Sequence, residues 1–253
     1  MTFQRISVSF QRNVCRVNLV GPNGRSEITA RLVSELEQVL FDPELAGKIL
    51  VLEGSEDVFC TGADLGAIVS HGEAPAPPPD PDRLYRLWLR LAYGPFVSVA
   101  HARGQTKAGG IGFVAACDIA LASSRSTFGL SELLFGLLPA CVMPFLERRV
   151  GSAKANYMTI MTMSFEATKV CQWGLLDECQ EDSVDLLRRH LLRLNHIPAR
   201  AIKEYKDYLR VKDTAGLLTN QHAAVQASHR AFSNSENRDA ISRFLSLRDA
   251  DDT

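Results

Sequence analysis

The residues best suited to chemistry lie in and around a glycine-rich segment in the middle of the chain. Residues 107–122 read KAGGIGFVAACDIALA, and Gly110, Gly112 and Ala115 match the pattern G-x-G-x-x-A. This pattern cradles the phosphates of a dinucleotide when a strand runs directly into the glycines and a helix follows them. Here the segment GQTKA separates the glycines from the preceding predicted strand, which ends near Arg103. The sequence therefore argues against a nucleotide site, and the plainest alternative is a helix packed closely on a sheet.

Glu132 is the ionisable residue that the sequence favours for proton transfer. Phe-Gly-Leu-Ser precedes it and Leu-Leu-Phe follows it, and such apolar surroundings predict a half-buried carboxyl with a raised pKa. The alternative is an exposed glutamate in the first turn of a helix, where its charge complements the helix dipole. Asp118 fits a structural role better, with its carboxylate bound to backbone or to a buried arginine.

Metal and nucleophile chemistry find little support in the sequence. The six cysteines are scattered without a C-x-x-C pair, and several lie in apolar runs, which predicts buried free thiols. No metal-ligand spacing occurs. Ser131 has no histidine near it in sequence and no nucleophile elbow around it. We therefore expect a site without a metal.

Composition excludes other function classes. The chain has 253 residues, a formal net charge of -1 and 46% hydrophobic residues, so no strong field draws it to nucleic acid or anionic lipid. The longest apolar run, LLFGLLPACVMPFL, is broken by prolines and too short for a bilayer. The N-terminus lacks the apolar core of a signal peptide. These features predict a cytoplasmic protein with neither nucleic acid nor membrane as a partner.

The predicted elements that must position these residues are alternating strands and helices. Two strands with a turn near Arg12–Asn13 open the chain, and KILVLEG, FVSVAHARG and DIALASS read as buried strands of a parallel sheet. A proline-rich loop over 74–81 precedes a helix expected to begin with Asp82 as its cap. From Gly151 onward the pattern is helical. The layout is an α/β core followed by a mostly helical tail.

Three motifs in a fixed order connect these elements to a known family. VFCTGADL (58–65), RGQTKAGGIGFVAACDIALA and STFGLSELLFGLLP (126–139) together resemble the crotonase, or enoyl-CoA hydratase/isomerase, superfamily, from about residue 3 to 245. The resemblance implies an α/β fold with a ββα spiral core over 1–195 and a C-terminal helical region over 196–253. That region would support a homotrimer or a dimer of trimers. The substrate would be a thioester on phosphopantetheine or CoA, with no other cofactor.

The same resemblance assigns roles to residues of the site. The backbone N–H groups of Ala63 and Gly109 would form an oxyanion hole for the thioester carbonyl, which suits a segment without obstructing side chains. The backbone around Thr61 and Asp64 would line the pantetheine or adenine pocket. Hydratases of this superfamily carry two glutamates. One is absent here, because its position is Gly112, and the other is Glu132.

A closer resemblance concerns the reaction. AGGIGFVAACDI, LSELLFGLLPACVMPFL and ANYMTIMT are similar to the dehydratases of polyketide β-branching cassettes. This resemblance implies dehydration of 3-hydroxy-3-methylglutaryl to 3-methylglutaconyl thioester on an acyl carrier protein, which would be the partner. The alternatives are a sibling decarboxylase of that product, an ordinary enoyl-CoA hydratase or isomerase, and a crotonase-fold binding module without catalysis.

A glutaryl substrate adds a distal carboxylate, which needs a cation. Lys107 and Arg103 flank the glycines and are candidates, although most lysines and arginines are solvated surface residues. Arg86 and Arg90 compete for the role. His229 is a further candidate, because the decarboxylase sibling uses a histidine in a similar segment, yet a histidine late in a helix is more often structural.

Overall fold

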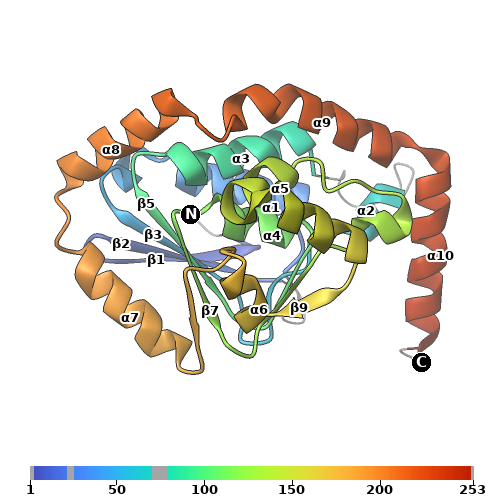
Figure 1. Ribbon diagram of the computed structural model, residues 1–253, viewed down its shortest axis with the longest axis horizontal. Coiled ribbons are helices and arrows are strands. Elements are labelled where there is room, and N and C mark those ends of the chain that lie inside the picture. Colours follow the sequence, from blue (N-terminus) through green and yellow to red (C-terminus); the bar gives the residue numbers. More distant parts are fainter. Residues whose placement is uncertain (1–2, 22–25, 70–78, 252–253) are drawn as a thin grey trace.

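The structure, a computed structural model, describes residues 3–21, 26–69 and 79–251 (Figure 1). Its larger sheet has the strand order β1-β2-β3-β5-β7-β10. The strands are β1 (Ile6–Gln11), β2 (Val14–Leu19), β3 (Ile49–Glu53), β5 (Val97–Ala102), β7 (Ile119–Ser123) and β10 (Glu178–Gln180). Only β1 and β2 pair antiparallel, through a turn at Arg12 and Asn13, and the other pairs are parallel. The predicted α/β fold is confirmed.

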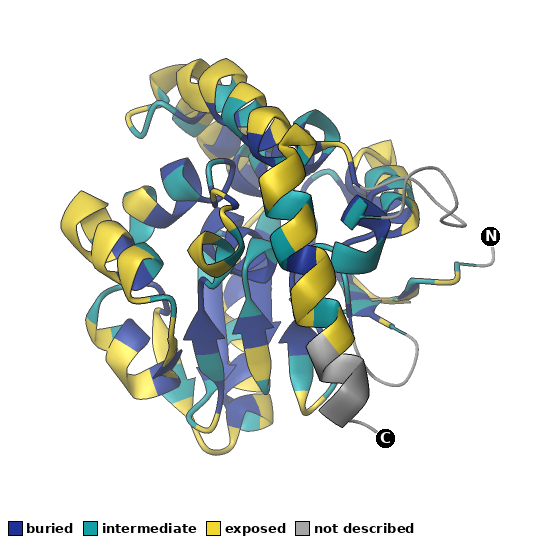
Figure 2. Cartoon of the chain, turned by 90° about the vertical axis from the view of Figure 1, so that its right-hand side faces the viewer, coloured by how far each residue is buried: buried dark blue, intermediate teal, exposed yellow. Residues whose placement is uncertain are grey.

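The apolar runs form central strands because both faces of this sheet are covered. Leu50 and Leu52 of β3 face the main core with helices α1 (Ala30–Leu40), α3 (Pro81–Tyr93) and α4 (Gly109–Ala116). Ile49 and Val51 point the other way, onto the leucines of α7 (Ser183–Leu194). In Figure 2 the strands are largely buried, and the helices around them expose their outer faces.

A second, smaller sheet carries the motifs. Its strand order is β4-β6-β8-β9, formed by β4 (Val58–Cys60), β6 (Gln105–Lys107), β8 (Thr127–Gly129) and β9 (Ser164–Glu166). β4, β6 and β8 are parallel neighbours, so their carboxyl ends lie along one edge. The three motifs of the sequence are therefore brought together where these strands end.

The glycine-rich segment begins a helix, and close packing explains one of its glycines. A Cβ at Gly110 would lie 2.5 Å from the carbonyl oxygen of Cys60, so α4 can approach β4 only with glycine there. The expectation of a helix packed closely on a sheet is confirmed. At the other end of α4, Arg148 Nη2 donates to the carbonyl oxygens of Ala115 and Ala116 at 2.8 and 3.0 Å, where a positive charge suits the helix C-terminus.

Helix α3 begins one residue earlier than its predicted cap. Pro81 is the first helical residue, and the Asp80 side chain accepts a hydrogen bond from the Asp82 N–H at 3.0 Å. The prediction of Asp82 as the cap was wrong, because proline is favoured in the first turn and the capping carboxylate then precedes it. Most of the predicted loop 74–81 lies outside the described residues.

From Gly151 onward the chain is mostly helical, as predicted, apart from the short strands β9 and β10. The remaining elements are η2 (Pro43–Leu45), α2 (Leu65–Val69), η3 (Glu132–Phe135), α5 (Met143–Met161), α6 (Ala167–Gln172), α8 (Ala199–Lys212), α9 (Leu217–Ser233) and α10 (Ser235–Asp251). In Figure 1, α8 and α9 run over α3, and α10 turns down beside α2. Leu217 and Ala224 of α9 belong to the main core. The division at residue 195 into two regions stays a prediction.

Other sequence predictions concern cysteines, metals and membranes. All six cysteines are free thiols, and four of them are buried. Within the described residues no cluster of His, Cys, Asp or Glu could hold a metal ion. None of the helices in those parts of the chain has the length and apolarity needed to cross a bilayer.

Candidate active site

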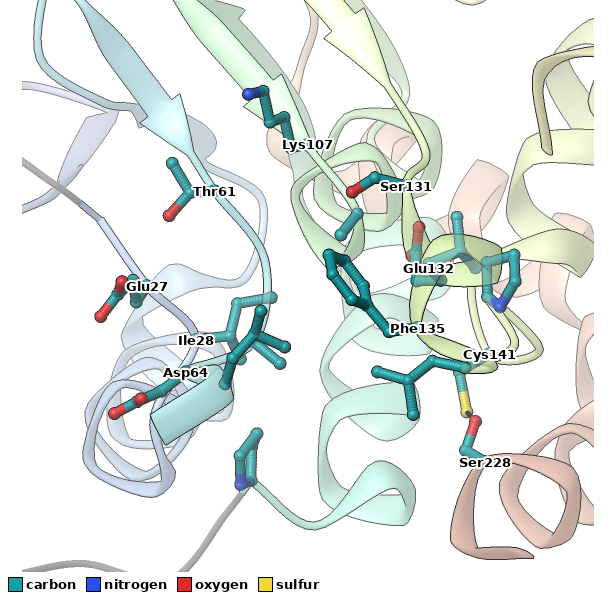
Figure 3. Close-up of a pocket in the computed structure, with 18 of the residues that line it drawn as sticks. Glu27, Ile28, Thr61, Asp64, Lys107, Ser131, Glu132, Phe135, Cys141 and Ser228 are labelled. Atoms are coloured by element: carbon teal, nitrogen blue, oxygen red, sulfur yellow. Dashed lines mark hydrogen bonds between the residues drawn. The ribbon is translucent and has the colours of Figure 1, made fainter. Parts of the chain in front are cut away.

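A cavity of about 700 Å³ lies at the carboxyl ends of β4, β6 and β8 (Figure 3). The segment after β4 contributes Thr61, Ala63 and Asp64, and Gly109 begins α4 after β6. The segment after β8 contributes Glu132. Helices α9 and α10 complete the wall with Ser228, Phe232, Phe244 and Leu245. The cavity therefore joins all three sequence motifs to the C-terminal helices.

The two predicted oxyanion donors come from segments that touch. A Cβ at Gly62, whose φ is +91°, would lie 2.6 Å from the Ala108 Cβ and 3.4 Å from the Gly109 nitrogen. The neighbouring backbone groups are paired, because Ile28 N–H donates to Gly62 O at 2.8 Å and Asp64 N–H donates to Ile28 O at 3.2 Å. In the described chain no hydrogen bond is made by the N–H of Ala63 or of Gly109. Both donors are thus free to bind a ligand oxygen.

Ala108 holds the start of α4 in a strained conformation. Its φ is 50° and its ψ is -125°, a combination that residues with a side chain rarely adopt. The Ala108 N–H donates to the carbonyl of Gly129 at 2.9 Å, which ties α4 to β8. Strain of this kind clusters at functional sites, and here it lies directly before the Gly109 N–H.

Glu132 is the first residue of η3, and burial raises its pKa to about 7. The backbone N–H groups of Glu132 and Ser131 offset part of this effect. Its Oε2 is buried and has no hydrogen-bond partner in the described chain. In Figure 3, Glu132 and Thr61 lie on opposite sides of the cavity. A carboxyl with this pKa can both take up and release a proton near neutral pH.

Gly112, where the superfamily pattern has a glutamate, faces an indole ring. A Cβ at Gly112 would overlap Trp88 Cζ2 and would lie 2.6 Å from Cε2 and 2.7 Å from Cη2. Trp88 also packs edge-on against Phe113 and Phe145, with ring centroids 5.9 and 5.7 Å away. No side chain fits at position 112 in this packing, so a second glutamate is excluded sterically as well as absent.

Trp88 also lines the cavity, which sequence reasoning missed. The helical periodicity of DRLYRLWLRL predicts core packing for Tyr85 and Trp88, and both are buried. Tyr85 donates its hydroxyl to Leu217 O at 2.7 Å. Trp88 Nε1, however, has no partner in the described chain. The available signal was the glycine at position 112, because a missing side chain leaves room for a large neighbour.

The candidate cations for the distal carboxylate differ in whether they line the cavity. Lys107 lines the cavity, and no other lysine or arginine of the described residues lines it. Arg103 does not line the cavity. Its guanidinium is bound elsewhere: Nη2 donates to Gly54 O at 3.3 Å, and Nη1 lies 3.5 Å from the carboxylate of Glu56.

The other candidates also lie outside the cavity wall. Arg86 pairs with Asp82 at 3.2 Å, and Arg90 donates to the carbonyl of Leu40 at 2.8 Å. His229 has a 56% exposed side chain and lies 3.9 Å from Asp80.

Asp118 has the structural role expected of it. Its carboxylate accepts from the Ser98 N–H at 2.9 Å and from Lys206 Nζ at 2.6 Å. The cation is therefore a buried lysine, where the sequence suggested an arginine. Asp64 likewise has a local structural bond, because its Oδ1 accepts from the N–H of Ala67 at 3.1 Å in the first turn of α2.

Comparison with known proteins places these features in a family. Residues 9–251 match the enoyl-CoA hydratase/isomerase model. The chain is 41% identical over 249 residues to the bacillaene synthase dehydratase PksH of Bacillus subtilis (strain 168), covering 97% of this chain and 95% of that protein. It is 27% identical over 253 residues to the 2,3-dehydroadipyl-CoA hydratase of Escherichia coli (strain K12), with 96% of each covered.

Solved structures agree with the sequence relatives. A crystal structure described as a putative polyketide biosynthesis enoyl-CoA hydratase (pksH) from Bacillus subtilis superposes with a TM-score of 0.90 at 40% identity, covering 97% of this chain and 98% of that one. An enoyl-CoA hydratase from Mycobacterium avium shares the fold with a TM-score of 0.81 at 24% identity, covering 97% and 98%. From its motifs, its fold and these likenesses, the chain belongs to the enoyl-CoA hydratase/isomerase family, the crotonase superfamily.

Proposed function

We propose that this protein is a cytoplasmic, hydratase-like dehydratase of polyketide biosynthesis. Its substrate would be a 3-hydroxy-3-methylglutaryl thioester on an acyl carrier protein, and its product the 3-methylglutaconyl thioester. The similarity to a bacillaene synthase dehydratase over nearly the whole chain supports dehydration in polyketide biosynthesis. The glutaryl substrate and the carrier rest on the finer motif resemblance.

One observation carries the proposal: a carboxyl with a pKa of about 7 and two unpaired backbone N–H groups line the same cavity. Removal of a proton next to a thioester carbonyl places negative charge on the carbonyl oxygen. Two preorganised N–H donors that point at the oxygen stabilise that charge. In our proposal Ala63 and Gly109 bind the thioester oxygen.

The proton steps then fall to Glu132. Ionised Glu132 removes a proton from C2, and the electron pair of that bond passes to the enolate. The C2=C3 double bond forms as the C3–O bond breaks, and the protonated Glu132 returns its proton to the departing oxygen, which leaves as water. One carboxyl can serve both steps because its raised pKa makes the two protonation states similar in free energy at neutral pH.

Lys107 is the proposed reader of the distal carboxylate. It is the described cation in the cavity wall, and the other candidates are held by partners outside it. The wall also carries apolar side chains such as Leu137, Val142 and Phe232, which suit the methyl branch and the acyl carbons. Thr61 and Asp64 lie across the cavity from Glu132 (Figure 3), and we propose that their backbone contacts the pantetheine arm.

The proposed assembly is a homotrimer or a dimer of trimers, with the region after residue 195 contributing to its contacts. Tyr157, Ile160 and Met161 near the end of α5, and Tyr205 and Val211 on α8, are large exposed apolar or aromatic side chains. Such residues are candidates for burial between subunits. Light scattering at micromolar concentration tests this, and a monomer would contradict it.

The reaction itself is tested by incubating the protein separately with 3-hydroxy-3-methylglutaryl thioester and with 3-methylglutaconyl thioester, each on a carrier protein. The mass of the acyl group is then measured by mass spectrometry. The proposal expects loss of water. Loss of carbon dioxide from the methylglutaconyl thioester would favour the decarboxylase, and no change with either thioester would favour a binding module. The same acyl group on CoA tests the carrier, because equal kcat/KM on both donors would contradict a preference for the carrier protein.

A further inference from the structure

Two buried polar atoms of the cavity wall lack hydrogen-bond partners, one an acceptor and one a donor. Of the buried side-chain nitrogens and oxygens without a partner in the described chain, only Glu132 Oε2 and Trp88 Nε1 belong to residues that line the cavity. Buried tryptophan N–H groups normally find an acceptor. Tyr85, one turn earlier on α3, follows this rule through its bond to Leu217 O. The exception at Trp88 therefore suggests that its acceptor is a ligand.

The indole of Trp88 packs closely against the start of α4. Phe113 and Phe145 pack against the ring at steep angles, 88° and 71°. Cζ2, which shares an edge of the indole with Nε1, lies 3.9 Å from the position of a Cβ on Gly109 and overlaps that of a Cβ on Gly112. The edge of the six-membered ring, to which Nε1 is joined through Cε2, thus packs beside the turn that carries the proposed oxyanion donor Gly109.

Two hydroxyl groups of the cavity wall already have partners within the chain. Thr61 Oγ1 lies 3.2 Å from Ser26 O, and Ser228 Oγ lies 3.2 Å from Cys141 Sγ. A thioester whose carbonyl oxygen is bound at Gly109 places C3 only two bonds from the carbonyl carbon. A hydroxyl on C3 is therefore close to the first turn of α4 and to the indole edge beside it.

We propose that Trp88 Nε1–H donates a hydrogen bond to the C3 oxygen of the 3-hydroxyacyl thioester and stabilises this oxygen as it leaves. This inference rests on the proposed dehydratase function and makes Trp88 a catalytic residue beside Glu132. The C2 proton passes to Glu132, the C3–O electron pair stays on oxygen, and Glu132 returns the proton to form water. The indole keeps its own proton throughout. Its contribution is a fixed donor at the place where negative charge grows.

The test separates C–O cleavage from C2 deprotonation. Trp88→Phe removes the N–H and shortens the ring. Incorporation of benzothienylalanine at position 88 replaces the N–H by sulfur and keeps the bicyclic shape. Each variant is assayed for dehydration of the carrier-bound 3-hydroxyacyl thioester. Each is also assayed for hydrogen–deuterium exchange at C2 of the matching thioester without the 3-hydroxyl, and Trp173→Phe, at a tryptophan outside the cavity wall, is the control.

We expect kcat for dehydration to fall on the order of 10- to 100-fold in both Trp88 variants, at the low end for a lost transition-state donor. C2 exchange should stay within about threefold of the parent, a small change in barrier, because it needs only Glu132 and the oxyanion donors. The benzothienylalanine variant decides the matter if Trp88→Phe does not fold. Unchanged dehydration in that variant, or equal losses in both reactions, would overturn the inference. A parent protein that dehydrates no 3-hydroxyacyl thioester would instead contradict the proposed function.

Discussion

Replacing Glu132 by glutamine should stabilise the protein at alkaline pH and leave its stability nearly unchanged at acid pH. Glutamine has the shape of a protonated glutamate and no ionisable proton. In the folded protein the pKa of Glu132 is about 7, against an ordinary value of 4.5. The folded state therefore holds the proton of Glu132 more tightly than the unfolded state, so ionisation of Glu132 opposes folding.

The size of the effect follows from the two pKa values. Below pH 4.5 the carboxyl is protonated in both states, and ionisation has no effect on stability. Between pH 4.5 and about 7 the unfolded state loses the proton first, so the free energy of unfolding falls as pH rises. Each tenfold change in proton affinity is worth about 1.4 kcal/mol, which sets an upper value of about 3 kcal/mol above pH 8. The side chain is not wholly shielded from water, so we expect about 1–3 kcal/mol.

The assay is urea unfolding of the parent and of Glu132→Gln at pH 5 and pH 8.5, at one fixed protein concentration because subunit association also affects stability. The advantage of the glutamine variant should be small at pH 5 and about 1–3 kcal/mol larger at pH 8.5. Glu147→Gln, at an exposed glutamate on α5, is the matched control. An equal difference in the free energy of unfolding at both pH values would refute the claim that folding raises the pKa of Glu132. A glutamine variant that loses stability relative to the parent as pH rises would refute it as well.

Three further predictions concern activity and packing. With Glu132 as base, kcat/KM of the parent should rise with pH and level off above about 7, and a rate that falls over this range would oppose the assignment. Lys107→Gln should raise KM for the glutaryl thioester about 10-fold or more and should hardly affect KM for an acyl thioester without the distal carboxylate. Arg103→Gln, the control, should leave both KM values unchanged. Equal losses on both substrates in Lys107→Gln would show that Lys107 is structural. Gly112→Ala should lower stability by about 1–3 kcal/mol, because its Cβ overlaps Trp88, and unchanged thermal unfolding would show that the indole has room to move.

Local sequence patterns predicted the parts of the fold that are long and apolar. KILVLEG, FVSVAHARG and DIALASS became β3, β5 and β7, because continuous apolar runs are what a sheet covered on both faces requires. The smaller sheet escaped prediction as a sheet, since β4, β6, β8 and β9 have three residues each. Strands so short show no periodicity, and only their tertiary pairing defines them.

The site was predictable where a residue's own neighbours decide its environment. The apolar residues around Glu132 predicted a half-buried carboxyl with a raised pKa, and the residue is partly buried with a pKa of about 7. Lys107 and Arg103 looked alike in sequence, because both flank the glycines. They differ only through contacts distant in the chain, with Arg103 bound at Gly54. Trp88 was missed for the same reason, because its contact with Gly112 is distant in the chain and the glycine alone does not name the large neighbour.

The central claim is that Glu132 moves the proton in a dehydration, and one measurement tests it most directly. The parent and Glu132→Gln are compared for kcat on the carrier-bound 3-hydroxy-3-methylglutaryl thioester, with folding checked by circular dichroism. Our account predicts that the variant remains folded and that kcat falls about 100- to 10,000-fold. A folded Glu132→Gln protein that dehydrates within about tenfold of the parent, a barrier change of about 1.4 kcal/mol, would contradict it.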